Sequence, residues 1–170
     1  AGTGKTLAWL WKVFHTAVTY PGAQCAIGRK VRASCSESIL ALLEREVIGP
    51  DIRFMGEAAP ANRHSYRFTN GSSIVVFGLD EVEKIMSANL DMVGLGEATD
   101  ATQDDWEKLA TRIGRSDHVL HPQLIGCVNP QGPSHWIKQA ADSGRIRMIE
   151  SRHEDNPVLW DREMERWTAL

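Results

Sequence analysis

The chain opens on a glycine-rich run that restricts the folds open to it. Its first six residues, Ala1, Gly2, Thr3, Gly4, Lys5 and Thr6, match the last six positions of the eight-residue pattern GxxxxGK[ST]. The first glycine of that pattern would lie two residues before the sequence begins. Loops of this kind join a strand to a helix and bind phosphate at the helix N-terminus, which predicts a P-loop α/β fold.

Each residue type in the run has a predicted role. Gly2 and Gly4 let backbone N–H groups approach the phosphates of a nucleotide such as ATP, and Lys5 pairs with the β and γ oxygens. Thr6 places its hydroxyl on Mg²⁺. An accidental Gly-Lys-Thr near a terminus is the alternative, but the apolar helix predicted directly after the loop favours phosphate binding.

Short apolar runs rich in β-branched residues alternate with helical patterns, which is typical of βα units around a mainly parallel sheet. The predicted class is therefore α/β, a RecA-like (ASCE) P-loop NTPase with flanking helices that lacks its first strand. Asn70-Gly71 between two apolar runs predicts a β-hairpin. Helices are predicted over 5–19, 103–113 and 158–167. Another helix is predicted to start at a possible capping box of Ser34 and Glu37 and to continue to residue 47, and a further one contains residues 135–137. Strands are predicted over 24–28, 65–68, 73–77, 90–95, 123–128 and 145–149.

The length of 170 residues and the 42% of hydrophobic residues suit one domain with a sizeable core. A net charge of −3 neither supports nor excludes DNA binding, because a local basic patch would be enough. Cys25, Cys35 and Cys127 show no CxxC spacing, so we expect core thiols and neither a disulfide framework nor a zinc site. The absence of a long apolar run or signal-peptide pattern predicts a soluble intracellular protein without membrane contact.

A predicted acidic strand end follows the hairpin. The run 90–99 has the form of a Walker B strand, and Glu97 is its predicted catalytic carboxylate, which would orient the attacking water. A surface or capping acid is the alternative. Gly96 stands where many such ATPases carry an aspartate that holds Mg²⁺ through water. Asp91 lies too far back to replace it, and Asp100 is either a nearer substitute or the N-cap of the next helix.

Basic residues supply two further sets of candidates. Arg29, Lys30 and Arg32 follow the strand predicted over 24–28. They would lie at the carboxyl edge of the sheet, where they would contact phosphate or DNA, or form a solvated turn. The candidates for a cation that a neighbouring subunit inserts to stabilise transition-state charge are Lys84, Arg112 and Arg115.

The histidines and tryptophans carry weaker signals. The histidines lack metal-ligand spacing, so no metal is predicted beyond the Mg²⁺ of the nucleotide. Trp9 and Trp11 fall about 200° apart on a helix, so at most one faces the core. Trp136 is more consistent with a packing anchor than with a base-stacking platform.

The order of these motifs resembles the ATPase domain of phage terminase large subunits over nearly the whole chain. The segment 70–80, NGSSIVVFGLD, is similar to the family's run ahead of Walker B, and Glu97-Ala98-Thr99-Asp100 with Leu109 and Arg112 resembles the run after it. Asn129-Pro130 with His135-Trp136-Ile137 is similar to the family's coupling segment. Asp155-Asn156-Pro157 resembles a stretch near the end of the domain.

The resemblance implies an ATP- and Mg²⁺-dependent motor that packs double-stranded DNA. Asn129 would sense the γ-phosphate and relay hydrolysis to movement, since an amide donates without titrating; an Asn-Pro turn without that role is the alternative. The resemblance also implies a homo-oligomeric ring on a portal protein, a small terminase subunit and the cytoplasm of an infected host cell.

The same resemblance sets the expected extent of the domain. Residues 1–170 would be a partial ATPase domain, with the first strand upstream and a nuclease domain downstream, so ATP turnover is expected of a longer chain and not necessarily of this segment alone. A non-hydrolytic nucleotide- or DNA-binding module, signalled by Gly96, is one alternative function. A helicase-like ATPase is another, although a second motor domain would not fit in this length.

Overall fold

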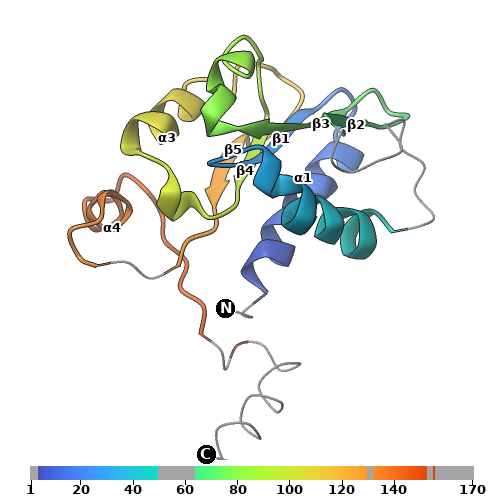
Figure 1. Cartoon of the computed structure of the whole chain (residues 1–170). Coiled ribbons are helices and arrows are strands. Elements are labelled where there is room, and N and C mark those ends of the chain that lie inside the picture. Colours follow the sequence, from blue (N-terminus) through green and yellow to red (C-terminus); the bar gives the residue numbers. More distant parts are fainter. Residues whose placement is uncertain (1–3, 50–63, 130–131, 153–154, 156–170) are drawn as a thin grey trace, which may run out of the picture.

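The computed structural model describes residues 4–49, 64–129, 132–152 and 155, in which strands and helices alternate (Figure 1). The strands are β1 (Gln24–Arg29), β2 (Ser65–Arg67), β3 (Ser73–Gly78), β4 (Met92–Leu95) and β5 (Gln123–Gly126). The helices are α1 (Lys5–Thr19), α2 (Ala33–Cys35), α3 (Gln103–Ala110) and α4 (Trp136–Asp142). Shorter π-type turns are η1 (Ser36–Leu40) and η2 (Leu43–Ile48), and 3-10 turns are η4 (Leu79–Lys84) and η5 (Ala98–Asp100).

The strands form one five-stranded sheet in the order β2-β3-β1-β4-β5. Strands β3, β1, β4 and β5 run parallel, and β2 pairs antiparallel with β3 through the predicted hairpin. The registers align Gly28 with Leu95 and Leu95 with Gly126, so β1, β4 and β5 end at the same edge. This confirms the predicted α/β class with a mainly parallel sheet.

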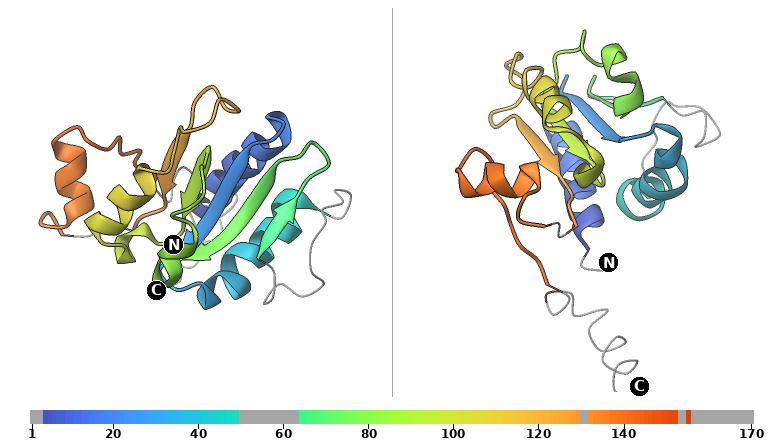
Figure 2. Two further views of the ribbon diagram at one scale, coloured as in Figure 1. Left: turned by 90° about the horizontal axis from the view of Figure 1, so that it is seen from above. Right: turned by 60° about the vertical axis from the view of Figure 1, so that its left-hand side comes forward.

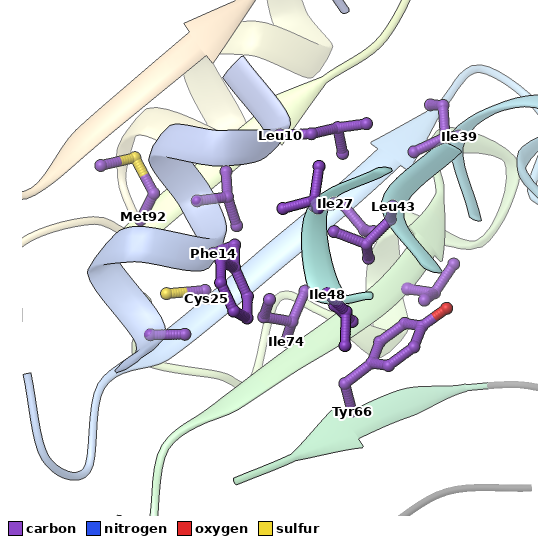
Figure 3. Packing of buried hydrophobic residues seen from close by; sticks show 14 of the residues in the cluster. Leu10, Phe14, Cys25, Ile27, Ile39, Leu43, Ile48, Tyr66, Ile74 and Met92 are labelled. Atoms are coloured by element: carbon purple, nitrogen blue, oxygen red, sulfur yellow. The ribbon is translucent and has the colours of Figure 1, made fainter. Parts of the chain in front are cut away.

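Helices cover both faces of the sheet (Figures 1 and 2). On one face, α1, η1 and η2 pack against alternate strand side chains such as Cys25, Ile27 and Ile74 (Figure 3). On the other face, Phe77 and Val93 join a second buried cluster that includes side chains of η4 and α3. The short apolar runs of the sequence are thus strands buried on both sides, as parallel sheets require.

The hairpin turn also holds the far end of α1. The Asn70 amide donates to the carbonyl oxygens of Ala17 and Val18 at 2.9 and 3.2 Å, and the Ser72 hydroxyl lies 2.6 Å from Ala17 O. The carbonyl groups of the last helical turn lack intrahelical donors, and these side chains supply them. Gly71 has a φ of 83°, the left-handed conformation that the turn requires.

Several predicted elements differ from the structure. Residues 145–149 form no strand, because no other strand lies alongside them in the described residues and an unpaired segment forms no ladder. Ser34 is not an N-cap: it lies inside α2, and its hydroxyl donates to Val31 O at 2.7 Å. The predicted helix over 158–167 lies outside the described residues, as do Pro130 and most of the segment 155–157.

The predicted first helix is confirmed. The predicted first helix has the bounds of α1, with Trp9 buried and Trp11 45% exposed, so one of the two tryptophans faces the core. Cys25 and Cys35 are buried and Cys127 is half-buried, all as free thiols. No helix within the described ranges is long and apolar enough to cross a bilayer.

Candidate functional site

The carboxyl edge of the sheet gathers the groups that the sequence predicts to act together. Arg29 ends β1, Glu97 lies two residues after β4, and Asn129 follows β5. Backbone hydrogen bonds tie these ends to one another: Gly96 N–H donates to Gly28 O and Ala98 N–H donates to Cys127 O, both at 2.8 Å. The edge is therefore one connected surface at the point where α1 begins.

Lys5 lies at this edge beside the end of β5. Its Nζ donates to Val128 O at 2.8 Å and lies 3.4 Å from Asn129 Oδ1. Gly4, immediately before the helix, has a φ of 73°, and the first intrahelical bond runs from Ala8 N to Gly4 O. The N–H groups of residues 5–7 therefore have no acceptor within α1, which is the arrangement that binds phosphate. Residues 1–3 lie outside the described part of the chain.

Glu97 has the least common backbone conformation of the site. Its φ and ψ are 51° and 48°, and it is the one non-glycine residue with positive φ among those described. The side chain is 53% exposed and forms an ion pair with Arg29 through Oε1. Left-handed non-glycine residues cluster at functional sites because they need support from the surrounding structure. Glu97 stands at the N-cap position of η5, but its side chain forms no hydrogen bond with the backbone of that turn.

Arg29 is held within the protein. Its side chain is 15% exposed; besides Glu97, its Nη1 donates to Ser34 O at 3.1 Å and to Ser38 Oγ at 2.9 Å. The guanidinium therefore contacts Glu97 in this structure, and the predicted contact of Arg29 with phosphate or DNA stays a prediction. The backbone N–H of Arg32 donates to Asp80 Oδ1 at 3.2 Å.

Lys30 has a different partner, Asp105 at 3.1 Å in the first turn of α3. Burial alone would raise the pKa of the Asp105 carboxyl, but hydrogen bonds from the Thr102 N–H and hydroxyl and the ammonium of Lys30 outweigh it and lower the pKa. Thr102, not Asp100, is the N-cap of α3 and forms a capping box with Asp105. The three-residue spacing of Thr102 and Asp105 was the available sequence signal for this capping box. The sequence offers no comparable signal for the hydrogen bond from Arg29 to Ser38.

The position of Gly96 bears on Mg²⁺. A Cβ there would lie 2.6 Å from Ile39 Cδ1 and 3.4 Å from Arg29 Cγ, so the Ile39 side chain, with Arg29 beside it, occupies the space into which an aspartate would project. Among the described residues no group of three or more His, Cys, Asp or Glu side chains could hold a metal. The Thr6 hydroxyl is a ligand that suits Mg²⁺, together with the phosphates of a nucleotide.

The remaining candidates lie elsewhere. Arg112 and Arg115 belong to the amino end of β4, where Leu90 N–H donates to Arg112 O and Gly114 N–H donates to Leu90 O. The structure does not bring either arginine to Lys5 and Glu97. Lys84 ends η4, and its side chain lies outside the described set.

Asp91 is also confirmed as distant, since it lies at the amino end of β4. It is fully buried, accepts a hydrogen bond from Gln24 N at 2.9 Å and pairs with the Ser116 hydroxyl. Burial, reinforced by the charge of Asp91, raises the pKa of the neighbouring Cys25 thiol to about 12. The hydrogen bonds of Asp91 attach the loop after α3 to the sheet, at the edge opposite to the carboxyl-edge site.

Comparisons with known proteins identify a family and a fold. A family described as "Phage terminase large subunit" matches residues 1–170. No curated protein matches the chain.

Solved structures show the same fold. The large terminase of a thermophilic bacteriophage in complex with ATP-gamma-S has a TM-score of 0.76 at 18% identity, over 98% of this chain and 41% of that one. The same protein in complex with ADP gives 0.77 at 19% identity, over 98% and 42%. The Thermus phage P74-26 large terminase ATPase domain gives 0.53 at 21% identity, over 76% and 57%. The chain thus spans about two fifths of the large terminase solved with these nucleotides.

Proposed function

Because the chain belongs to the phage terminase large subunit family, we propose that residues 1–170 form part of an ATPase domain that couples ATP hydrolysis to the movement of double-stranded DNA into a capsid. The observation that supports this most is the convergence of Lys5, Glu97 and Asn129 on one sheet edge. Lys5 contacts the end of β5 directly, and the residue after Glu97 bonds to Cys127 O in the same strand end. Relatives solved with ATP-gamma-S and ADP support nucleotide as the ligand.

Each group has a proposed task. Lys5 and the N–H groups of the first turn of α1 bind the β and γ phosphates, and the Thr6 hydroxyl holds Mg²⁺. The metal, when bound with the nucleotide, neutralises phosphate charge. Glu97 is about half exposed and uses Oε1 for Arg29, so its other oxygen can accept a hydrogen bond from the attacking water.

Asn129 is proposed to sense the γ-phosphate. Its amide lies beside Lys5 Nζ, and that ammonium also holds Val128 O. A phosphate that recruits Lys5 must replace these contacts, which changes the hydrogen bonding at the end of β5. The binding of nucleotide would thereby change the hydrogen bonds just before the segment that follows Asn129.

The wider assembly is proposed from the family alone. We expect a homo-oligomeric ring on a portal protein, with a small terminase subunit, in the cytoplasm of the infected host cell. Arg29 and Arg32 remain candidates for a contact with phosphate or DNA. For the cation inserted into a neighbouring site, Arg112 and Arg115 are candidates because they lie away from their own subunit's Lys5, and Lys84 remains a third.

One observation favours a second function. Gly96 carries no carboxylate, and Arg29 lies against its position, so the site has fewer Mg²⁺ ligands than most P-loop ATPases. A module that binds nucleotide without hydrolysing it would have this property.

Mg²⁺-dependent ATP hydrolysis separates the two functions. It is measured with and without double-stranded DNA on a chain extended upstream of Ala1 to complete the loop (the extended chain), and on its Glu97→Gln variant. We expect kcat to fall by about 10²–10⁴-fold in Glu97→Gln, with ATP affinity retained. Glu107→Gln, the same change at an exposed glutamate of α3, is the matched control and should retain kcat. ATP binding without turnover in the parent would instead establish the non-hydrolytic module.

A further inference from the structure

The turn that follows Glu97 ends in carbonyl groups that need donors from outside it. Within η5 the Asp100 N–H donates to Glu97 O at 2.9 Å and the Ala101 N–H donates to Ala98 O at 3.2 Å. Ala101 then becomes extended, with φ −78° and ψ 145°, so the short helical turn stops there. The last carbonyl groups of such a turn have no donor within the turn itself.

Two adjacent side chains of the α4 start supply those donors. His135 Nε2 lies 3.3 Å from Thr99 O, and Trp136 Nε1 donates to Ala101 O at 2.8 Å. The His135 tautomer follows from its second contact: Ile137 N–H donates to Nδ1 at 3.3 Å, so Nδ1 accepts and the proton lies on Nε2. His135 therefore donates to Thr99 O while it caps α4.

Both donors are held firmly in place. The Trp136 ring packs against Trp106 of α3 with 6.0 Å between ring centroids, and Ile137 and Ala140 bury the inner face of α4. The sequence predicts a packing role for Trp136, and the indole N–H adds a directed hydrogen bond to that role. His135 and Trp136 thus join α4 to the turn at carbonyl groups on both sides of Asp100.

We propose that His135 and Trp136 are positioning residues for Glu97, a role that rests on the function proposed above. On its strand side Glu97 is fixed by the bonds from Gly96 to Gly28 and from Ala98 to Cys127. In the turn after Glu97, the constraint comes from the carbonyl groups of Thr99 and Ala101, which bond to His135 and Trp136. A glutamate with left-handed backbone angles persists only where the structure on both sides of it constrains its backbone. Small displacements of a carboxylate that orients the attacking water reduce the rate of hydrolysis.

Three variants of the extended chain separate positioning from packing. Trp136→Phe keeps a ring against Trp106 and removes the donor to Ala101. His135→Asn keeps an acceptor for Ile137 N–H but is too short to reach Thr99, whereas His135→Gln places an amide donor near the position of Nε2. Gln139→Ala is the matched control, because it removes a side-chain bond to Ser134 O from the same helix without touching the turn.

The first readout is the split between kcat and ATP affinity. We expect kcat to fall about tenfold or more in Trp136→Phe and in His135→Asn, with the ATP Kd within about twofold of the parent. His135→Gln should recover most of the loss, and Gln139→Ala should match the parent. Unchanged kcat in both Trp136→Phe and His135→Asn, beside an active parent and an inactive Glu97→Gln, overturns the positioning role and leaves the proposed function intact.

The second readout does not depend on turnover. Amide hydrogen exchange at Asp100 and Ala101 should accelerate in Trp136→Phe and His135→Asn and stay at the parental rate in Gln139→Ala. Parental exchange in all variants overturns the inference even if kcat changes. Accelerated exchange with no hydrolysis in the parent overturns the proposed function and, with it, the catalytic meaning of these two hydrogen bonds.

Discussion

Gly94 is the residue at which a single methyl group should disturb the contact between the sheet and α1. A Cβ built at Gly94 would lie 2.4 Å from Cε3 and Cζ3 of Trp9 and 3.1 Å from Val13 Cγ2. Carbon atoms pack best at about 3.5–4.0 Å, so the indole must retreat by about 1.1–1.6 Å. Trp9 is 4% exposed and has little room to move. Overpacking of this kind costs about 1–3 kcal/mol.

The expected result for Gly94→Ala is a melting temperature lower by about 2–12 °C for a domain of this size, measured by circular dichroism and calorimetry. ATP affinity of the extended chain should fall as well, because Trp9 lies one helical turn after Lys5. Gly132→Ala is the matched control, since a Cβ there meets nothing within 4 Å and the residue has no positive φ.

A double-mutant cycle tests the cause directly. Trp9→Leu frees the space that the new methyl group needs, so Gly94→Ala should cost less in that background, with an interaction energy of at least about 1 kcal/mol. A Gly94→Ala protein as stable as Gly132→Ala, or strictly additive effects in the cycle, would refute the packing argument.

Three further outcomes follow from the described contacts. Ser72→Ala should lower the free energy of unfolding by about 0.5–1.5 kcal/mol in urea titrations, because a buried hydroxyl no longer bonds to Ala17 O; an unchanged midpoint would contradict this. The pKa of Asp105 is lowered because its capping bonds and lysine partner outweigh burial, so its contribution to stability is complete above the ordinary carboxyl pKa near about 4 and is lost as pH falls through the lower folded value. Asp105→Asn should therefore show a flatter loss of stability below about pH 4, and parallel pH profiles would refute the assignment. Burial and Asp91 raise the pKa of Cys25 to about 12, so at pH 8 only about one thiol in 10⁴ is ionised, and mass spectrometry should find iodoacetamide on Cys127 well before Cys25.

The fold was largely predictable because its signals are local. Apolar runs bounded by turn residues give β1, β3 and β4, and Asn70-Gly71 gives the hairpin. The segment 145–149 carries the same alternation as a strand, yet strand formation depends on a paired neighbour that a local pattern does not encode. The α3 cap was missed for a related reason, since Asp100 and Thr102 are both good capping residues and only the path of the chain chooses between them.

In the candidate site, the positions of some residues could be predicted from the sequence, whereas their side-chain contacts could not. Lys5, Glu97 and Asn129 follow from motif order and from the rule that parallel strands end at one edge, and their proximity along that edge agrees with the structure. The partners of Arg29 were not predictable, because the ion pair with Glu97 depends on the left-handed turn after Gly96. Likewise, the bonds from His135 and Trp136 to the turn join residues more than 30 positions apart.

The anchorage of α1 by the hairpin has a mechanical consequence. With 15 residues the helix is about 22 Å long; Asn70 and Ser72 hold its carboxyl end, and Lys5 lies at the opposite end, where it bonds to Val128 O. A displacement of about 1 Å at the Lys5 end corresponds to a tilt of only about 3° over this length. Residues near the hairpin would move little in such a tilt, whereas Trp9 lies close to the Lys5 end. A displacement of Lys5 would therefore reach β4 through the contact of Trp9 with Gly94, and the end of β5 through Val128.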